Sequence, residues 1–487
     1  MLSIRHLRIS VRGKSLLQIE ELQFQPGRVH AIIGESGSGK SLMLLTLMGL
    51  LAPELSVEAD ELTWNGEDWL MADSRTWQKR RGKVMGMVFQ EPMTALNPQL
   101  RCGDQLMEAY SIHEPHTPKD EARRHCLAKL ERAGLGSLAE RVMDSFPHEL
   151  SGGQRQRVVI AMACMHNPAW VLADEPTTAL DSFTRMAVMS DLKRLCQEQG
   201  SGLIWVSHEL DIVAEMAQEI SVLRKGQCLA AGPAAEVLNP NSCHPYVAEL
   251  IEALPKGSAS NVASDRPVLD IRQLFKSYMR NGQAQSVLNG FSATVHRGET
   301  LVILGKSGSG KSTLAKLLTG LEKPDSGEIW LSGKPLPLRP PTGIQMVFQD
   351  PYASLNQQQE SWYAVAEVLA QQQGGRPADH RSLAESKLRE VQLPESLFSV
   401  RPRRMSGGQR QRLCLARALA SEPEVLVLDE AVAALDPLVQ AAVLDLLKHI
   451  QQTRGTVFIF ITHDQAVARS IGNQIVYLEN GHAQPYV

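Results

Sequence analysis

Two glycine-rich stretches have the composition of a phosphate-binding loop. Their sequences are GESGSGKS at residues 34–41 and GKSGSGKS at residues 305–312. Each follows an apolar run that favours a buried strand and precedes an apolar run with helical spacing. Glycines let the backbone curl so that successive N–H groups face a phosphate, and the following helix adds the positive end of its dipole. The pattern therefore predicts two nucleotide-binding loops.

All the residues of these loops are predicted nucleotide contacts. They are Gly34, Glu35, Ser36, Gly37, Ser38, Gly39, Lys40 and Ser41 in the first loop and Gly305, Lys306, Ser307, Gly308, Ser309, Gly310, Lys311 and Ser312 in the second. We expect Lys40 and Lys311 to reach the β- and γ-phosphates of the nucleotide. The hydroxyl groups of Ser41 and Ser312 are expected to bind Mg²⁺.

An apolar run that ends in two acidic residues also occurs twice. The runs are WVLADEP at residues 170–176 and VLVLDEA at residues 425–431. In a chain with phosphate-binding loops, such a strand predicts that Asp174 and Asp429 are further Mg²⁺ ligands. Glu175 and Glu430 are expected to polarise the attacking water, and a general base of this kind contributes roughly 10²–10⁴ in rate. The alternative is that these acids only cap the next helix.

The order of the blocks indicates a tandem duplication. VFQ, SGGQRQR, the Asp-Glu pair and a histidine after an apolar run follow each glycine-rich loop in the same order. Between the loop and VFQ the first copy has about a dozen extra residues, which include part of a polar, basic insert at residues 64–81. We predict α/β domains at residues 1–253 and 268–487, joined by a flexible Ser-, Gly- and Asn-containing linker at residues 254–267.

Composition narrows the class of protein. The chain has 487 residues, 43% hydrophobic and 21% charged, which is ordinary for globular domains. A net charge of −3 gives no electrostatic reason to expect a nucleic-acid partner. No apolar run is long enough to span a membrane, and the first residues do not resemble a secretion signal. The seven cysteines form no CxxC pair, so we expect reduced thiols in a cytoplasmic protein.

SGGQRQR, placed between the phosphate loop and the Asp-Glu pair, resembles the signature of ABC-type ATPase domains. The resemblance covers nearly the whole chain and implies two P-loop domains, each with a parallel-sheet core, an antiparallel β subdomain and a helical subdomain. In that family the domains pair head to tail, and each ATP lies between the loop of one and the signature of the other. Fusion would make this pairing intramolecular.

The resemblance also assigns roles to residues outside the loops. The signature contacts to ATP are Ser151, Gly152, Gly153 and Gln154 in one copy and Ser406, Gly407, Gly408 and Gln409 in the other. It makes His208 and His463 sensors of the γ-phosphate and places Gln90 and Gln349 near Mg²⁺ and the water. Asp181 and Asp436 match the D-loop at the domain interface.

Adenine stacking distinguishes the two copies. Tyr278 occupies the place at which the family usually has an aromatic residue that stacks on adenine, whereas the first copy has Val11 at the matching position. The first site therefore has no clear aromatic partner for the base.

Two further stretches resemble the ATPases of peptide and nickel importers. One is FQEPMTALN at residues 89–97, repeated as FQDPYASLN at 348–356, and the other is CHPYVAELIEALP at 243–255. The resemblance implies a subunit at the cytoplasmic face of the inner membrane, working with two membrane permease subunits and a solute-binding protein. With Cys243 the only cysteine in that tail, no iron–sulfur cluster is expected. Peptide and nickel or metal-chelate cargo both stay open, and the alternative is a soluble ABC-type ATPase that acts on ribosomes or nucleic acid.

Overall fold

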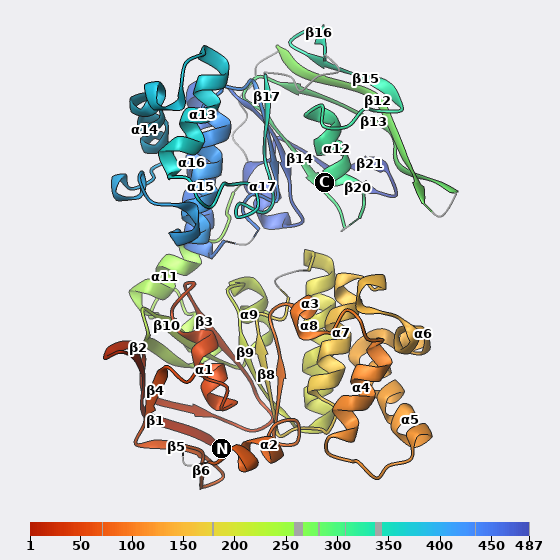
Figure 1. Ribbon diagram of the computed structural model, residues 1–487, viewed down its shortest axis with the longest axis vertical. Coiled ribbons are helices and arrows are strands. Elements are labelled where there is room, and N and C mark those ends of the chain that lie inside the picture. The colour runs from red at the N-terminus through yellow and green to blue at the C-terminus, as the bar shows by residue number, and fades with distance from the viewer. Residues whose placement is uncertain are drawn as a thin grey trace. The chain divides into compact units, whose positions relative to one another are not determined.

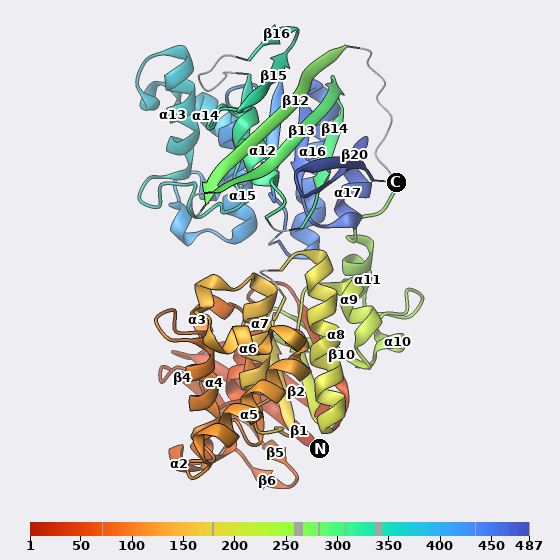
Figure 2. The same ribbon diagram turned by 90° about the vertical axis from the view of Figure 1, so that its right-hand side faces the viewer.

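The structure, a computed structural model, consists of two compact units, Met1–Glu252 and Ala253–Val487 (Figures 1 and 2). The described residues are 1–70, 72–177, 180–257, 266–280, 283–306, 308–336, 343–433 and 435–486, without the side chains of residues 182, 183 and 280. Most of the expected linker, residues 258–265, lies outside this part of the chain. The fold is the α/β architecture predicted above.

The strands of the first unit form one sheet, which has eleven strands among the described residues. The order is β6-β5-β1-β2-β11-β10-β3-β9-β8-β7, and β4 also pairs with β1. The strands are β1 Leu2–Val11, β2 Lys14–Phe24, β3 Val29–Gly34, β4 Leu55–Glu58, β5 Glu61–Trp64, β6 Glu67–Asp68, β7 Met85–Val88, β8 Trp170–Asp174, β9 Gly202–Val206, β10 Glu219–Arg224 and β11 Gln227–Pro233. Strands β7, β8, β9, β3 and β10 are parallel, and the rest of the sheet is largely antiparallel.

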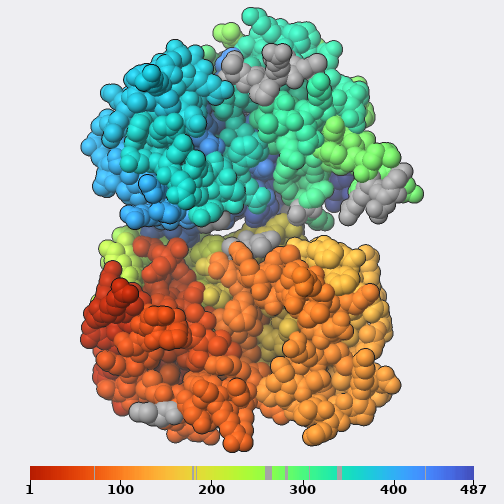
Figure 3. Space-filling model, viewed as in Figure 1, coloured from red at the N-terminus to blue at the C-terminus, as the bar shows by residue number. Residues whose placement is uncertain are grey.

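Some helices of the first unit lie beside the parallel strands, and others lie farther from them (Figure 1). They are α1 Lys40–Leu47, α2 Ser74–Arg80, α3 Pro92–Ala95, α4 Cys102–Ser111, α5 Lys119–Leu130, α6 Ala139–Asp144, α7 Gly152–Ala163, α8 Ser182–Gln199, α9 Leu210–Met216, α10 Ala234–Val237 and α11 Pro245–Glu252. Figure 3 shows the surface of this unit, with the N-terminal strands in red and the segment of α4–α6 in orange. None of the helices in the described part of either unit is long and apolar enough to cross a bilayer.

The second unit repeats this plan with two sheets, ordered β13-β12-β15-β16 and β17-β18-β19-β14-β20-β21. The strands are β12 Pro267–Arg280, β13 Gln283–His296, β14 Thr300–Leu304, β15 Ser326–Leu331, β16 Lys334–Pro335, β17 Ile344–Val347, β18 Val425–Asp429, β19 Val457–Ile461, β20 Gln474–Glu479 and β21 His482–Pro485. The helices are α12 Lys311–Leu318, α13 Ser361–Gln373, α14 Arg381–Glu390, α15 Gly407–Leu419, α16 Pro437–Arg454 and α17 Gln465–Ile471.

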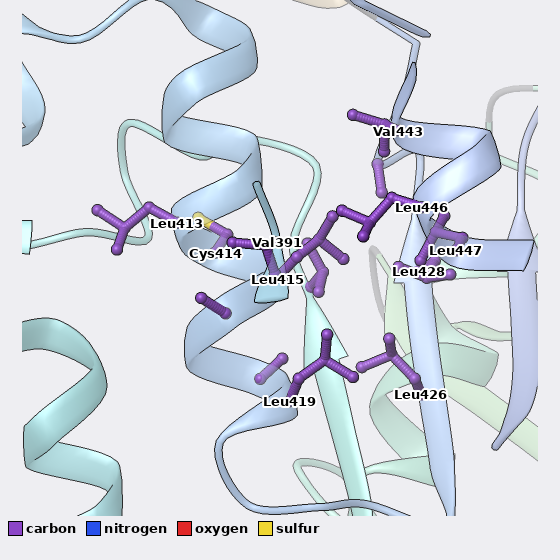
Figure 4. Close-up of a cluster of buried hydrophobic side chains, with 14 of the residues drawn as sticks. Val391, Leu413, Cys414, Leu415, Leu419, Leu426, Leu428, Val443, Leu446 and Leu447 are labelled. Carbon is purple, nitrogen blue, oxygen red and sulfur yellow. The ribbon is translucent and has the colours of Figure 1, made fainter. Parts of the chain in front are cut away.

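Strand β18 shows how the core holds the site. Successive side chains of a strand point to opposite faces of its sheet. Val425 and Val427 therefore pack with α12 and the antiparallel sheet, whereas Leu426 and Leu428 pack with the helical part, as Figure 4 shows for Leu426 and Leu428. All four side chains are fully buried. The strand is thus fixed on both faces, and its carboxyl end presents Asp429 at the edge where open α/β sheets bind ligands.

The insert expected at residues 64–81 has an aromatic core that its polar sequence conceals. The rings of Trp64 and Trp69 lie 6.1 Å apart, and those of Trp69 and Trp77 lie 5.4 Å apart. The guanidinium of Arg80 lies 4.7 Å from the Trp69 ring centre, so a charged residue completes the apolar cluster. Next to this cluster, Arg81 donates hydrogen bonds to the carbonyl groups of Met48 and Gly49. The insert therefore secures the carboxyl end of α1.

Candidate nucleotide-binding sites

The first phosphate-binding loop connects β3 to α1, as predicted. Gly34, Gly37 and Gly39 have positive φ angles of 151°, 80° and 98°. At Gly34 a Cβ atom would lie 2.0 Å from the carbonyl oxygen of Leu223, so only glycine fits there. The Lys40 Nζ donates to the Gly34 and Glu35 carbonyl oxygens at 2.7 and 2.8 Å. The ammonium group is therefore held over the loop.

The second loop has the same geometry. The Nζ of Lys311 donates to the carbonyl oxygens of Gly305 and Lys306 at 2.7 and 2.8 Å. Gly310, immediately before α12, has a φ of 107°. Ser307, which was predicted to contact the nucleotide, lies outside the described residues.

The expected Mg²⁺ ligands of the first unit lie together. The Ser41 Oγ donates a hydrogen bond to the Asp174 Oδ1 at 3.1 Å. Burial raises the pKa of Asp174, and burial likewise raises the pKa of Asp429, against an opposing hydrogen bond from Ser312. A buried carboxylate beside a hydroxyl oxygen offers the hard ligands that Mg²⁺ prefers. The residues present therefore fit this ion.

Glu175 and Glu430 share an unusual backbone conformation. Both have positive φ angles, 43° and 48°, in the left-handed region that residues other than glycine seldom adopt. Each backbone N–H donates to the neighbouring strand, that of Glu175 to Val206 at 3.1 Å and that of Glu430 to Ile461 at 3.0 Å. Strained residues of this kind cluster at functional sites, where the surrounding structure holds them in place.

In the first unit the Glu175 carboxylate lies between the predicted glutamine and histidine. The Nε2 of Gln90 donates to the Oε2 of Glu175 at 3.0 Å, and the Nδ1 of His208 lies 3.5 Å from the same oxygen. Gln90 follows β7 and His208 follows β9, so three neighbouring parallel strands bring the three side chains together.

The second unit assembles the same set. The Nε2 of Gln349 donates to the Oε2 of Glu430 at 2.7 Å. The Nδ1 of His463 lies 3.4 Å from the Oε1 of Glu430. Each unit therefore contains a carboxylate held by an amide donor and an imidazole, an arrangement that can align a water molecule and accept its proton.

Each signature begins a helix, α7 in the first unit and α15 in the second. The Ser151 Oγ accepts from the Gln154 N–H, and the Gln154 Oε1 accepts from the Ser151 N–H, which forms a capping box on α7. At Gly153 a Cβ atom would lie 2.5 Å from the Cγ2 of Thr184 on α8.

In the second unit Ser406 and Gln409 form the same box on α15. A Cβ atom at Gly408 would lie 2.4 Å from the Cγ1 of Val439, whereas one at Gly407 would meet nothing within 4 Å. The N-terminus of a helix attracts phosphate. The pairing of each signature with the loop of the other unit stays a prediction.

The strand ladders make Val11 the counterpart of Tyr278. In β1, Ile9 pairs with Leu17 and Ser10 with Ser15, with a register shift between the two pairs. In β12 the same shift separates the Lys276–Leu288 and Ser277–Ser286 pairs. The residue that follows is Val11 in β1 and Tyr278 in β12. The Tyr278 hydroxyl donates to Glu322, just beyond α12, and the ring is partly exposed. The ammonium of Lys276 lies 5.5 Å from the ring centre. Stacking of this ring on adenine stays a prediction.

Sequence reasoning missed a polar contact beside the first site. Glu209 follows His208, and its carboxylate forms an ion pair with Arg185 and accepts a hydrogen bond from Thr177. The signal that could have revealed it is a difference between the two copies. The second copy has Val432, Gln440 and Asp464 at the positions that match Thr177, Arg185 and Glu209.

Comparison with known proteins places these sites in a family. The model of the ABC transporter family matches residues 17–178 and 288–433. The chain therefore belongs to this family, with two copies of its ATP-binding domain, which makes it an ATPase.

Three curated relatives align over 99% of this chain. It is similar to the uncharacterized ABC transporter ATP-binding protein YejF of Escherichia coli K12, with 35% identity and 94% of that protein covered. It is also similar to the peptidoglycan transport ATP-binding protein YejF of Agrobacterium fabrum, with 34% identity and 91% covered. The glutathione import ATP-binding protein GsiA of Escherichia coli K12 shows 33% identity, with 85% covered.

A solved structure shares the fold over almost the whole chain. It contains an archaeal ribosome recycling factor, with a TM-score of 0.67 over 97% of this chain and 88% of the other. At 20% identity this likeness concerns the fold alone.

Proposed function

We propose that the protein is the energy-coupling ATPase subunit of an importer that moves peptides through separate membrane permeases. The observation that carries this proposal is the complete Gln–Glu–His set in both units. Relatives whose names state peptidoglycan transport and glutathione import support import and favour cargo with peptide bonds. Nickel or metal-chelate cargo is the second candidate.

In the proposed cycle each ATP binds between the loop of one unit and the signature of the other. The ammonium groups of Lys40 and Lys311 exchange their carbonyl partners for phosphate oxygens. The Ser41–Asp174 and Ser312–Asp429 pairs, together with Gln90 and Gln349, would hold Mg²⁺, which would supply positive charge to the phosphate groups. The signature helices α7 and α15 add backbone N–H groups and their dipoles from the opposite side.

Hydrolysis then depends on the carboxylates of Glu175 and Glu430. Each accepts a proton from a water molecule as the water oxygen attacks the γ-phosphorus and the bond to ADP breaks. The amide of Gln90 or Gln349 holds the carboxylate, and His208 or His463 contacts the γ-phosphate. Closure and reopening of the paired units drive two permease subunits, which receive cargo from a solute-binding protein. The protein would therefore act at the cytoplasmic face of the inner membrane.

The test of the chemistry is the Glu175→Gln/Glu430→Gln chain. It should bind ATP with unchanged affinity and lose at least about 10²-fold of the steady-state hydrolysis rate. Unchanged hydrolysis would show that these carboxylates are not the bases.

The test of the partner is purification of the tagged full chain from its own cells in mild detergent. Two hydrophobic permease subunits should be recovered with it. Recovery with ribosomes in their place would overturn the importer proposal. Stimulation of ATPase activity by a peptide-loaded binding protein, and not by a nickel-loaded one, would identify the cargo class.

A further inference from the structure

A buried ion pair links three segments beside the first ATP site. The carboxylate of Glu209 forms an ion pair with Arg185, and its Oε2 accepts a hydrogen bond from the Thr177 Oγ1 at 3.2 Å. The side chains of Arg185 and Glu209 are only 14% and 8% exposed. Since water is largely excluded, each charge depends on its partner.

The residues of this ion pair lie next to residues of the first candidate ATP site. Glu209 is adjacent to His208, whose Nδ1 lies 3.5 Å from the Glu175 carboxylate. Thr177 lies just beyond Glu175, and Arg185 is in the first turn of α8, which Asp181 caps through the Thr184 N–H. One carboxylate thus ties the histidine loop to both ends of the segment between β8 and α8.

The second unit has a different arrangement at every one of these positions. Val432 replaces Thr177 and is buried in the apolar cluster, and Gln440 replaces Arg185. Asp464 replaces Glu209 and accepts from the Ala466 and Val467 N–H groups at 2.8 and 3.1 Å, which caps α17.

The capping difference follows from this exchange. In the first unit α9 has no side-chain cap, because the Glu209 carboxylate turns towards Arg185. The two histidine loops are therefore held by different means.

We propose that Arg185 is a positioning residue of the first ATP site. Through Glu209 it fixes the loop that presents His208 to Glu175, whereas the His463 loop of the second site depends on its own helix cap. The two sites are consequently non-equivalent in hydrolysis although their phosphate-contacting residues match. This inference rests on the proposed roles of Glu175 and His208.

Substitution of Arg185 is expected to change the position of the loop that carries His208. Without the guanidinium, the Glu209 carboxylate stays charged in a place that excludes water, and the loop must move to expose it. The imidazole of His208 moves with the loop. A misplacement of about 1 Å in an active site can lower a rate by up to about 10²-fold. The phosphate loop lies on other segments, so ATP binding should be unaffected.

The experiment compares Arg185→Gln with its matched control, Gln440→Ala, in the full chain. We expect Arg185→Gln to lower kcat about tenfold while KM for ATP and the affinity for ATP change less than about twofold. Gln440→Ala should leave both kinetic constants within about twofold of the parent. Arg185→Lys, which keeps the charge, should recover part of kcat.

A graft of the second unit's residues separates positioning from folding. Thr177→Val/Arg185→Gln/Glu209→Asp removes the buried charge pair and supplies a shorter acid that can cap α9. We expect it to recover most of kcat, with an unfolding temperature close to that of the parent. Failure to recover kcat in a folded graft would contradict the inference.

Two other results would overturn it. One is an equal loss of kcat in Gln440→Ala, and the other is a rise in KM for Arg185→Gln that matches the fall in kcat. The proposed function fails by different measurements. The proposed function would fail if Glu175→Gln/Glu430→Gln still hydrolysed ATP or if no permeases were recovered in the purification. In either case the kinetic effects of the Arg185 and Gln440 variants could still be compared with each other.

Discussion

Glu35 in the first phosphate-binding loop forms a salt bridge with Arg224 at the end of β10, with 3.1 Å between Nε and Oε1. The second unit has the same bridge with the charges exchanged, since Lys306 lies 3.7 Å from Glu479. The opposite signs indicate that the side chain at this loop position serves to tether the loop. The backbone N–H groups are then left to meet the phosphates.

Because the two units carry this salt bridge with opposite charges, we predict that exchanging the charges of Lys306 and Glu479 leaves the stability of the second unit unchanged. Lys306→Glu places two carboxylates together and should lower the free energy of unfolding by about 0.5 kcal/mol at low salt. Lys306→Glu/Glu479→Arg should restore the parent value. Urea unfolding at 0.05 M and 1 M salt measures both, because screening should remove the difference. A defect in the double variant equal to that of the single one would contradict the tether.

His30 predicts an acid-sensitive first unit. Burial lowers the pKa of His30 from 6.5 to about 4, and its Nε2 lies 2.8 Å from the Ser221 Oγ. The unfolded chain therefore binds a proton more readily, so stability falls as the pH drops from 6.5 towards 4. The loss is at most about 3 kcal/mol.

The second unit supplies the control for His30. It has Leu301 and Val476 at the matching positions. His30→Leu/Ser221→Val should remove this pH dependence, which urea midpoints at pH 7 and pH 5 would report. The same slope in parent and variant would assign it to other groups.

Arg81 predicts a stability link between the insert and the first phosphate loop. Its two hydrogen bonds end at the carbonyl groups of Met48 and Gly49, just beyond α1, and Trp77 packs against Gly49. Because hydrogen bonds from charged groups contribute about 1.5–3 kcal/mol, Arg81→Ala should destabilise the first unit by about 2 kcal/mol. Arg75 is exposed on α2, which ends just before Arg81, so Arg75→Ala is the control. Thermal unfolding of both variants measures the effect. Equal melting temperatures for Arg81→Ala and Arg75→Ala would contradict the predicted link.

Tyr278 predicts unequal adenine affinity. Stacking of a base on an aromatic ring contributes about 1–3 kcal/mol, so Tyr278→Ala should weaken ATP binding at the second loop about tenfold. Conversely, Val11→Tyr should tighten binding at the first loop. Titration with a fluorescent ATP analogue, with the other site disabled by Lys40→Ala or Lys311→Ala, measures each loop separately. No gain from Val11→Tyr would mean that another side chain already holds the base there.

The site was largely predictable because its parts are local. A phosphate loop needs closely spaced glycines and a lysine, and a candidate catalytic carboxylate stands at the end of a buried strand, so Lys40 and Glu175 stand out in the sequence. Parallel strands then bring their carboxyl ends to one edge without further information.

Contacts between distant residues could not be read in this way. The contact of Glu209 with Arg185 depends on how a loop and a helix pack, and neither residue type is unusual in its own segment. The insert was misleading for a related reason: two of its charged residues, Arg80 and Arg81, lie on indole rings, so a polar sequence concealed an apolar cluster. Even so, both features coincide with differences between the two copies, which is the signal that a duplicated chain offers.

The close approach of Gly153 to Thr184, and of Gly408 to Val439, affects how inactive alleles should be interpreted. A side chain at either glycine would push α8 or α16 away from the signature helix, so a null phenotype there reports disturbed packing as much as lost contact with ATP. Gly407 has open space around it, so a mutation at that codon would test the predicted nucleotide contact without disturbing this helix packing. In a genetic screen, inactive alleles at the neighbouring codons 407 and 408 should therefore be interpreted differently, the first in terms of nucleotide contact and the second in terms of helix packing as well.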